Sequence, residues 1–169
     1  MGLSNSENKQ GDTLGRQNKE ENKAGTRAPI EIKYGGKIIY RGPAYFNSGL
    51  RAEERIPFII IPKSIAEKAG IPIKGITEAK GFTISYLGET DVWVEVRVAS
   101  GKTKSKWVRA RVYIDPFKKE PFINTTLCNE IGIKFLDWDE GLWILEEALP
   151  DEMKKMLKQL YEIARKQKH

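Results

Sequence analysis

Short runs of alternating apolar and polar residues, separated by turn residues, restrict what this chain can fold into. Residues 30–34 alternate with a period of two, and Gly35-Gly36 follows as a dipeptide typical of a hairpin turn. Comparable runs recur at residues 83–87, 92–98 and 107–114. Because a period of two places apolar side chains on one face of a strand, these runs predict an all-β domain with short helices.

Two shorter patterns add helices and a buried strand to this expectation. The apolar run at residues 58–61 stops at Pro62 and predicts a strand buried on both faces. Ser64 is expected to cap a short helix that ends at Gly70. A second short helix is predicted over residues 125–131, and a last strand over residues 142–145.

The ends of the chain differ from its centre. Residues 1–28 contain few large apolar side chains and are predicted to be a disordered tail, followed by a β domain over residues 29–147. Residues 148–169 form the third part, a C-terminal amphipathic helix with apolar residues on one face and many basic residues elsewhere. We expect this face to dock on the β domain or on a partner chain; the alternative is a basic helix for nucleic acid or a membrane surface.

Composition excludes several kinds of chemistry. The chain has one cysteine, Cys128, and one histidine, His169, so an intramolecular disulfide, a cysteine-based zinc site and histidine-dependent hydrolysis are not expected. We therefore predict no metal and no cofactor, and a reducing, cytoplasmic location. No apolar stretch is long enough to span a bilayer. The net charge of +6 permits nucleic-acid binding.

Several segments in a fixed order carry a resemblance to a known family. A predicted hairpin leads to Asn47-Ser48-Gly49, then to the apolar strand ending at Pro62 and the short helix closing in Ala69-Gly70-Ile71. Residues 120–133 later repeat the strand, helix and glycine pattern, and residues 137–145 follow with an acidic turn and a strand. Over residues 30–145 the chain resembles the retropepsin-like aspartic proteases, with Asn-Ser-Gly in place of Asp-Thr-Gly.

The resemblance implies a closed β barrel with a flap hairpin near residues 78–92. It also implies a homodimer, since the family closes its sheet and its active cleft only between two subunits, and an extended peptide or protein segment as ligand. In the family, two aspartates share one proton and activate a water molecule. Asn47 cannot act in this way because an amide is not a general base near neutral pH. We therefore expect a homologue with impaired catalysis.

Three interpretations of this segment stay open. Asn47, Ser48 and Gly49 are all turn residues and can form a plain turn. They can instead be a degenerate protease site kept for dimerisation or peptide binding. The third possibility is an active site that uses Glu53 or Glu54 from the inserted residues 50–57, although such glutamates usually lie in a solvated loop. Asn124 stands where the family usually has glycine, a mild change because asparagine tolerates a positive φ angle.

Two other functions compete with this one. Residues 60–71 are also similar to the AbrB-type transcription factors, which makes a nucleic-acid-binding module an alternative; that family's Lys-Gly-Gln-type turn is missing here. The second alternative is a protein-interaction scaffold that binds through its terminal helix. The four tryptophans are expected in the core or at an interface rather than as platforms for stacked bases.

Overall fold

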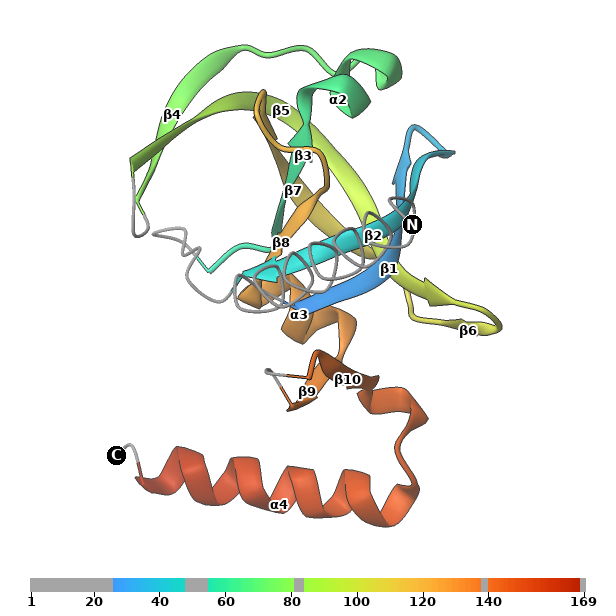
Figure 1. Ribbon diagram of the computed structural model, residues 1–169. Helices are drawn as coiled ribbons and strands as arrows, with labels where there is room; N and C mark the ends of the chain where they lie inside the picture. The colour runs from blue at the N-terminus through green and yellow to red at the C-terminus, as the bar shows by residue number, and fades with distance from the viewer. Residues whose placement is uncertain (1–25, 48–54, 81–83, 138–139, 168–169) are drawn as a thin grey trace, which may run out of the picture.

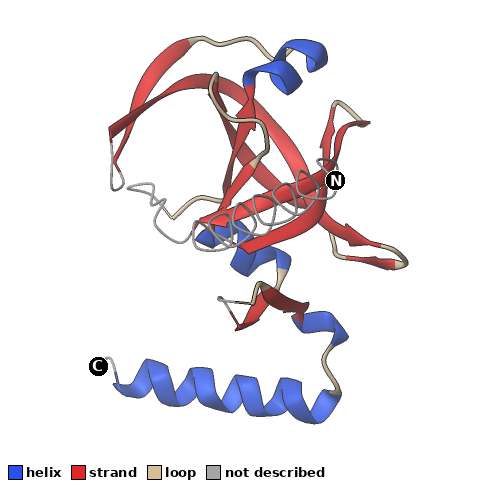
Figure 2. Ribbon diagram, in the orientation of Figure 1, coloured by secondary structure: helices blue, strands red, loops and turns tan. Residues whose placement is uncertain are grey.

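The computed structural model describes residues 26–47, 55–80, 84–137 and 140–167 (Figure 1). The strands are β1 (Thr26–Tyr34), β2 (Lys37–Asn47), β3 (Phe58–Pro62), β4 (Gly75–Lys80), β5 (Ile84–Ser100), β6 (Thr103–Lys104), β7 (Val108–Asp115), β8 (Phe122–Asn124), β9 (Ile133–Asp137) and β10 (Leu142–Leu145). The helices are α2 (Lys63–Ala69), α3 (Thr125–Ile131) and α4 (Asp151–Gln167), with the 3-10 turn η1 (Glu146–Ala148). The predominance of strands in Figure 2 confirms the predicted all-β class.

Six strands form a closed barrel in the order β1-β2-β8-β3-β7-β5. Pairing of Ile30 with Val98 and of Ile32 with Val96 joins β1 back to β5 and closes the ring. The β-barrel prediction is thus confirmed, but the expectation that the sheet closes only between two subunits is wrong for this chain. Its own first strand supplies the missing pairing, so no second subunit is needed to complete the barrel.

The barrel interior is filled by the inward half of each alternating strand. Ile59 and Ile61 of β3 point into it together with Val112 and Ile114 of β7, and all four are essentially inaccessible to solvent. Leu127, Cys128 and Ile131 of α3 extend the same core at one end of the barrel. The apolar residues of the period-two pattern are therefore the ones whose side chains face this core.

Strand β5 differs from the prediction. Residues 83–87 and 92–98 were expected to be separate strands, but residues 84–100 form one continuous strand of 17 residues. A register irregularity between Glu89 and Trp93 takes the place of the expected turn. Such an irregularity bends a strand without ending it, so β5 pairs first with β4, then with β7 and finally with β1.

The predicted glycine positions at a turn and at a helix end are confirmed, whereas one predicted helix cap is wrong. Gly35 and Gly36 take φ angles of 58° and 81° in the β1–β2 turn, and Gly70 ends α2 in the left-handed conformation. Helix α2 begins at Lys63, so Ser64 lies inside its first turn and makes no capping hydrogen bond there; Pro62 occupies the cap position. The predicted helix over residues 125–131 matches α3.

The C-terminal part lies beside the barrel. β9, which the sequence patterns did not predict, pairs with β10 in a separate two-stranded sheet. Helix α4 then runs below this hairpin in Figure 1 and has no buried residue. The helix is confirmed; none of its residues is buried, and its Tyr161 ring lies against Lys134 of β9. None of the described helices is long and apolar enough to cross a membrane.

Candidate functional site

The parallel pairing of β2 with β8 defines the region where the Asn47-Ser48-Gly49 segment begins. Tyr45 lies beside Phe122, Phe46 beside Ile123 and Asn47 beside Asn124. Strand β8 also pairs antiparallel with β3, so the end of β2, the end of β8 and the start of β3 meet at one rim of the barrel. Asn47 is the last residue of β2. Ser48, Gly49, Glu53 and Glu54 lie outside the described residues.

Asn124 organises this rim through its side-chain amide. Its Oδ1 accepts hydrogen bonds from the backbone nitrogens of Phe58 at 3.0 Å and Leu127 at 2.9 Å, while its Nδ2 donates to the carbonyl oxygen of Ile56 at 3.0 Å. The residue is only 2% exposed. It therefore caps α3 and fixes the chain that enters β3 at the same time.

The φ angle of Asn124 is −82°, so the tolerance of positive φ that the sequence suggested is not what this position uses. Its place directly before a helix was a signal for a cap. Its bonds to Ile56 and Phe58, 68 and 66 residues earlier in the chain, depend on the tertiary fold and have no local signature.

An aromatic wall covers the outer side of the same strands. Phe58, Ile60 and Leu87 form a second apolar cluster, against which the half-buried Tyr113 and Phe122 pack. The ring of Phe58 meets that of Tyr113 edge to face at 5.3 Å, and Tyr45 stacks on Phe122 at 4.9 Å. This wall exists because β3 is apolar on both faces, one toward the barrel core and one toward the wall.

Cationic side chains border the aromatic wall. The guanidinium of Arg27 lies 4.4 Å from the centre of the Tyr45 ring, forms a hydrogen bond with the Tyr45 hydroxyl and pairs with Glu120 at 3.3 Å. The ammonium of Lys118 lies 3.8 Å from the centre of the Phe122 ring. Apolar rings bordered by positive charge favour ligands that combine apolar side chains with carboxylates.

The hairpin of β4 and β5 lies next to the wall. Thr77 pairs with Leu87, and Glu78 pairs with Tyr86. Opposed residues in an antiparallel pair share a face, so Thr77 lies on the same face as Leu87, whose side chain packs in the wall, and Tyr86 lies on the other face. Residues 75–80 and 84–89 thus form a hairpin over part of the region predicted to be the flap, residues 78–92.

An ionic cluster centred on the buried carboxylate of Glu31 lies on the outside of the barrel. The Glu31 carboxylate accepts hydrogen bonds from Arg41 Nε at 2.6 Å and from Arg97 Nε at 2.9 Å. The hydrogen bond from Arg41 is the largest cause that lowers the pKa of Glu31 below its usual range, with Arg97 adding to it against the cost of burial. Both carboxylate oxygens of Glu31 thus accept a hydrogen bond, one from Arg41 of β2 and one from Arg97 of β5. We therefore assign the cluster a structural role, which is to hold these strands against β1.

The other candidate groups are engaged or buried. Burial raises the pKa of the Cys128 thiol to about 12, so this cysteine is a poor nucleophile. Trp107 has Lys33 and Arg97 each 4.2 Å from its ring centre, and Trp93 has Arg109 at 4.5 Å. Within the described part of the chain, no three His, Cys, Asp or Glu side chains are grouped to hold a metal ion.

No protein-family model, no curated protein and no solved structure matches this chain.

Proposed function

We propose that this protein is a retropepsin-like homodimer that binds an extended peptide or protein segment and has lost the aspartate chemistry. The proposal combines the sequence resemblance with the geometry of the barrel rim. By the resemblance, Asn47 takes the position of the family's catalytic aspartate; it lies at that rim, two residues after Tyr45, which stacks on Phe122 of the aromatic wall.

The in-register pairing of Asn47 with Asn124 is the observation that carries the proposal. Parallel strands are uncommon in a barrel built mostly from hairpins, because they require long connections. Here two of the six barrel contacts, β2–β8 and β3–β7, are parallel. The β2–β8 pair ends at Asn47, the first residue of the Asn-Ser-Gly motif, so the motif starts where the first and second halves of the chain are joined.

The aromatic wall supports a binding role. An extended segment next to the β4–β5 hairpin can add main-chain hydrogen bonds, as in other strand-addition complexes. The accessible parts of Phe122 and Tyr113 would contact its apolar side chains, and Lys118 would contact a carboxylate, while Arg27 stays paired with Glu120 and Tyr45. The ligand class that fits is an extended segment with alternating apolar and acidic residues.

The test compares the natural protein with Asn47→Asp and Asn47→Ala on a broad peptide library between about pH 3 and 7, the range in which an aspartate dyad titrates. Cleavage products are read by mass spectrometry. We expect no cleavage by the natural protein or by the alanine control, and cleavage by the aspartate variant at acidic pH. The natural protein is expected to retain peptides of the class above on an affinity column.

Two results would contradict the proposal. Cleavage by the natural protein would show a working site and would direct attention to Glu53 and Glu54. If none of the three proteins cleaves a peptide, and the natural protein retains none, the retropepsin-like interpretation would be wrong and the nucleic-acid and scaffold alternatives would gain support.

The nucleic-acid alternative is tested in the same preparation by binding to single- and double-stranded DNA at low salt. The tryptophans give it little support. Lys33 and Arg97 already lie on the ring of Trp107, and Arg109 lies on Trp93, so these rings act in intramolecular contacts.

A further inference from the structure

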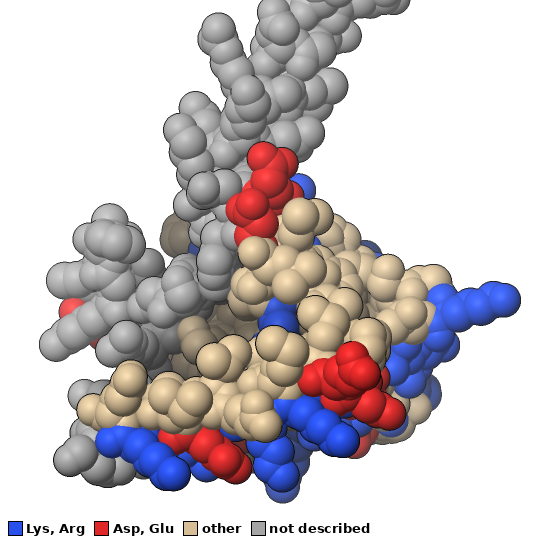
Figure 3. Space-filling view, turned by 90° about the horizontal axis from the view of Figure 1, so that it is seen from below, with Lys and Arg blue, Asp and Glu red and all other residues tan. Residues whose placement is uncertain are grey.

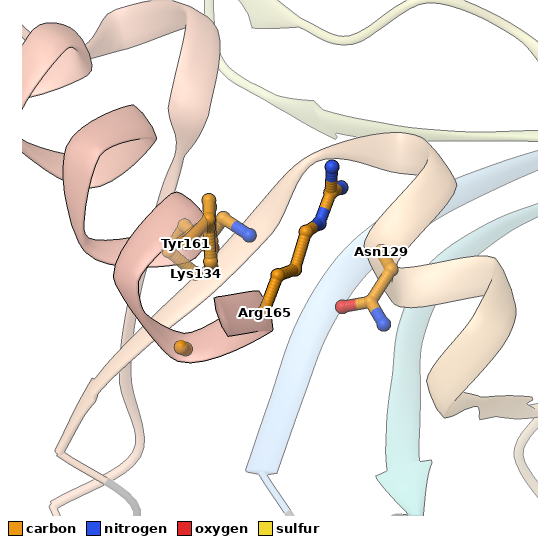
Figure 4. A pocket seen from close by; sticks show the side chains of 5 residues that line it. Asn129, Lys134, Tyr161 and Arg165 are labelled. Carbon is orange, nitrogen blue, oxygen red and sulfur yellow. The ribbon is translucent and has the colours of Figure 1, made fainter. Parts of the chain in front are cut away.

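Helix α4 has one side turned toward the rest of the chain. The ammonium of Lys134, on β9, lies 4.7 Å from the centre of the Tyr161 ring. Tyr161, Ala164 and Arg165 line a pocket together with Asn129 of α3 and Lys134, and Figure 4 shows these side chains converging between the helices. This side of α4 is thus in contact with its own chain.

A second side of α4 carries an apolar stripe that its own chain leaves uncovered. Met153, Met156, Leu160 and Ile163 are each more than half exposed. Their spacing of three, four and three residues places them along one line of the helix surface, the spacing of core positions in helix pairs. Seen from below in Figure 3, charged side chains gather along one edge of this part of the molecule, and a broad area without charge lies beside them.

The charges that border the stripe indicate what covers it. Glu152, Gln159 and Lys166 are exposed and recur every seven residues, so they follow one edge of the stripe. Glu152 lies seven residues before Gln159, and Lys166 lies seven residues after it. If two copies of α4 lie antiparallel with a two-fold axis at Gln159, Glu152 of each copy faces Lys166 of the other. A parallel pair has no such match, because it brings the acidic first turns together and the basic last turns together.

We propose that α4 pairs with α4 of a second copy of this chain in an antiparallel arrangement centred on Gln159. Along the stripe, Met153 then lies nearest Ile163 of the second copy, and Leu160 lies nearest Met156; both apolar pairs are centred on position 158, one residue from Gln159. An acidic first turn and a basic last turn also favour an isolated helix through its dipole. Self-pairing is indicated more specifically by the position of Glu152 and Lys166 on the border of the exposed stripe.

The pairing is expected to be weak when it acts alone. A helix of 17 residues is about 25 Å long, and two such helices bury less area than the roughly 1,200 Å² of a stable interface. We therefore expect a dissociation constant on the order of 1–100 μM, or a lower value if the barrels add contacts. The inference does not depend on peptide binding by the barrel.

Cross-linking of single-cysteine variants of the full chain tests both the pairing and its direction. The native Cys128 is buried and its thiol has a pKa of about 12, so an introduced cysteine is the reactive one. Glu152→Cys and Lys166→Cys proteins, one carrying a mass tag, are treated with a short bismaleimide separately and after mixing. We expect the hetero-linked dimer to predominate in the mixture and each variant alone to link poorly. Lys158→Cys, on the side of α4 opposite the stripe, is the matched control and should not link.

Charge reversal gives an independent measurement by sedimentation equilibrium. Glu152→Lys and Lys166→Glu should each weaken the dimer by about tenfold, because two attractive pairs become repulsive. The double variant Glu152→Lys/Lys166→Glu should recover most of that loss, since the attraction is restored with the signs exchanged.

Three results would overturn the inference: a monomer at several hundred micromolar, Glu152→Cys linking to itself as in a parallel pair, or no recovery in the double charge variant. A dimer that forms without the 152–166 cross-link would refute the α4 pairing and leave a barrel-mediated dimer intact. A cross-linked α4 pair with no peptide retention and no cleavage by Asn47→Asp would refute the proposed function and leave the α4 pairing intact.

Discussion

Replacing Asn124 with alanine tests whether one buried amide holds the rim of the barrel together. The change removes the acceptor for two backbone N–H groups, those of Phe58 and Leu127, and the donor to the carbonyl of Ile56. Leu127 is fully buried and Phe58 is 5% exposed. Water therefore has little access to the groups that lose their partners.

The expected cost follows from these contacts. Loss of a helix N-cap costs about 1 kcal/mol, and each buried backbone group left without a partner costs about 1–3 kcal/mol. Because the chain around Ile56 can relax in part, we expect Asn124→Ala to lower the free energy of unfolding by about 3–5 kcal/mol. That is a large share of the roughly 5–15 kcal/mol that stabilises a typical domain.

Urea unfolding followed by tryptophan fluorescence measures this loss. The matched control is Asn129→Ala, because Asn129 is exposed on the same helix and the change is expected to stay within about 0.5 kcal/mol. Asn124→Asp should cost less than alanine, since a carboxylate keeps both acceptor contacts and lies favourably at the start of α3. A loss of only about 1 kcal/mol in Asn124→Ala would mean that the residue is a simple cap, and the link to β3 would contribute nothing.

Two further predictions concern the ionic cluster and the last helix. Glu31→Gln should destabilise the protein by about 1–2 kcal/mol at neutral pH, less than a fully buried pair, because Arg41 is 70% exposed and can turn to solvent. The pKa of Glu31 is lowered in the folded state, so the stability that its carboxylate contributes is complete above the ordinary pKa of 4.5 and is lost as pH falls through the folded value. The difference in free energy of unfolding between the natural protein and Glu31→Gln, measured in urea, should therefore disappear in acid and persist in base. Deleting residues 150–169 should leave the urea midpoint of the barrel unchanged, since α4 has no buried residue, and should abolish the proposed dimer in sedimentation equilibrium. A large drop in the midpoint would show that α4 packs on the barrel.

The strands and turns of the barrel were largely predictable because their signals are local. Residues 30–34 alternate along one strand, and Gly35-Gly36 meets a backbone requirement at one turn, where both φ angles are positive. The same holds for α3, whose first and last residues were predicted correctly. β5 was missed as a single strand because the polar residues 88–91 look like a turn, and only pairing with two different neighbours keeps them extended.

The candidate site was less predictable because its contacts join distant segments. Asn124 could be recognised as a cap from its neighbours, but not as the residue that holds Ile56 and Phe58. Tyr45 and Phe122 are far apart in the sequence and stack only because β2 and β8 run parallel. The closure of the barrel by β1 and β5 was missed for the same reason, since no local pattern announces a pairing between strands more than 60 residues apart.

On the proposals above, the closed barrel would fold within one chain, and the exposed helix would associate with a second copy. A domain whose sheet closes within one chain, and whose core is filled by its own strands, can fold before it meets a partner. In the proposed α4 pair, the stripe that is exposed in the single chain would become buried. With Asn47 in place of an aspartate, the proposed dimer would bring no pair of carboxylates together and would have no shared proton to lose. Its association should therefore depend on salt, through Glu152 and Lys166, more than on a titrating group at the barrel rim.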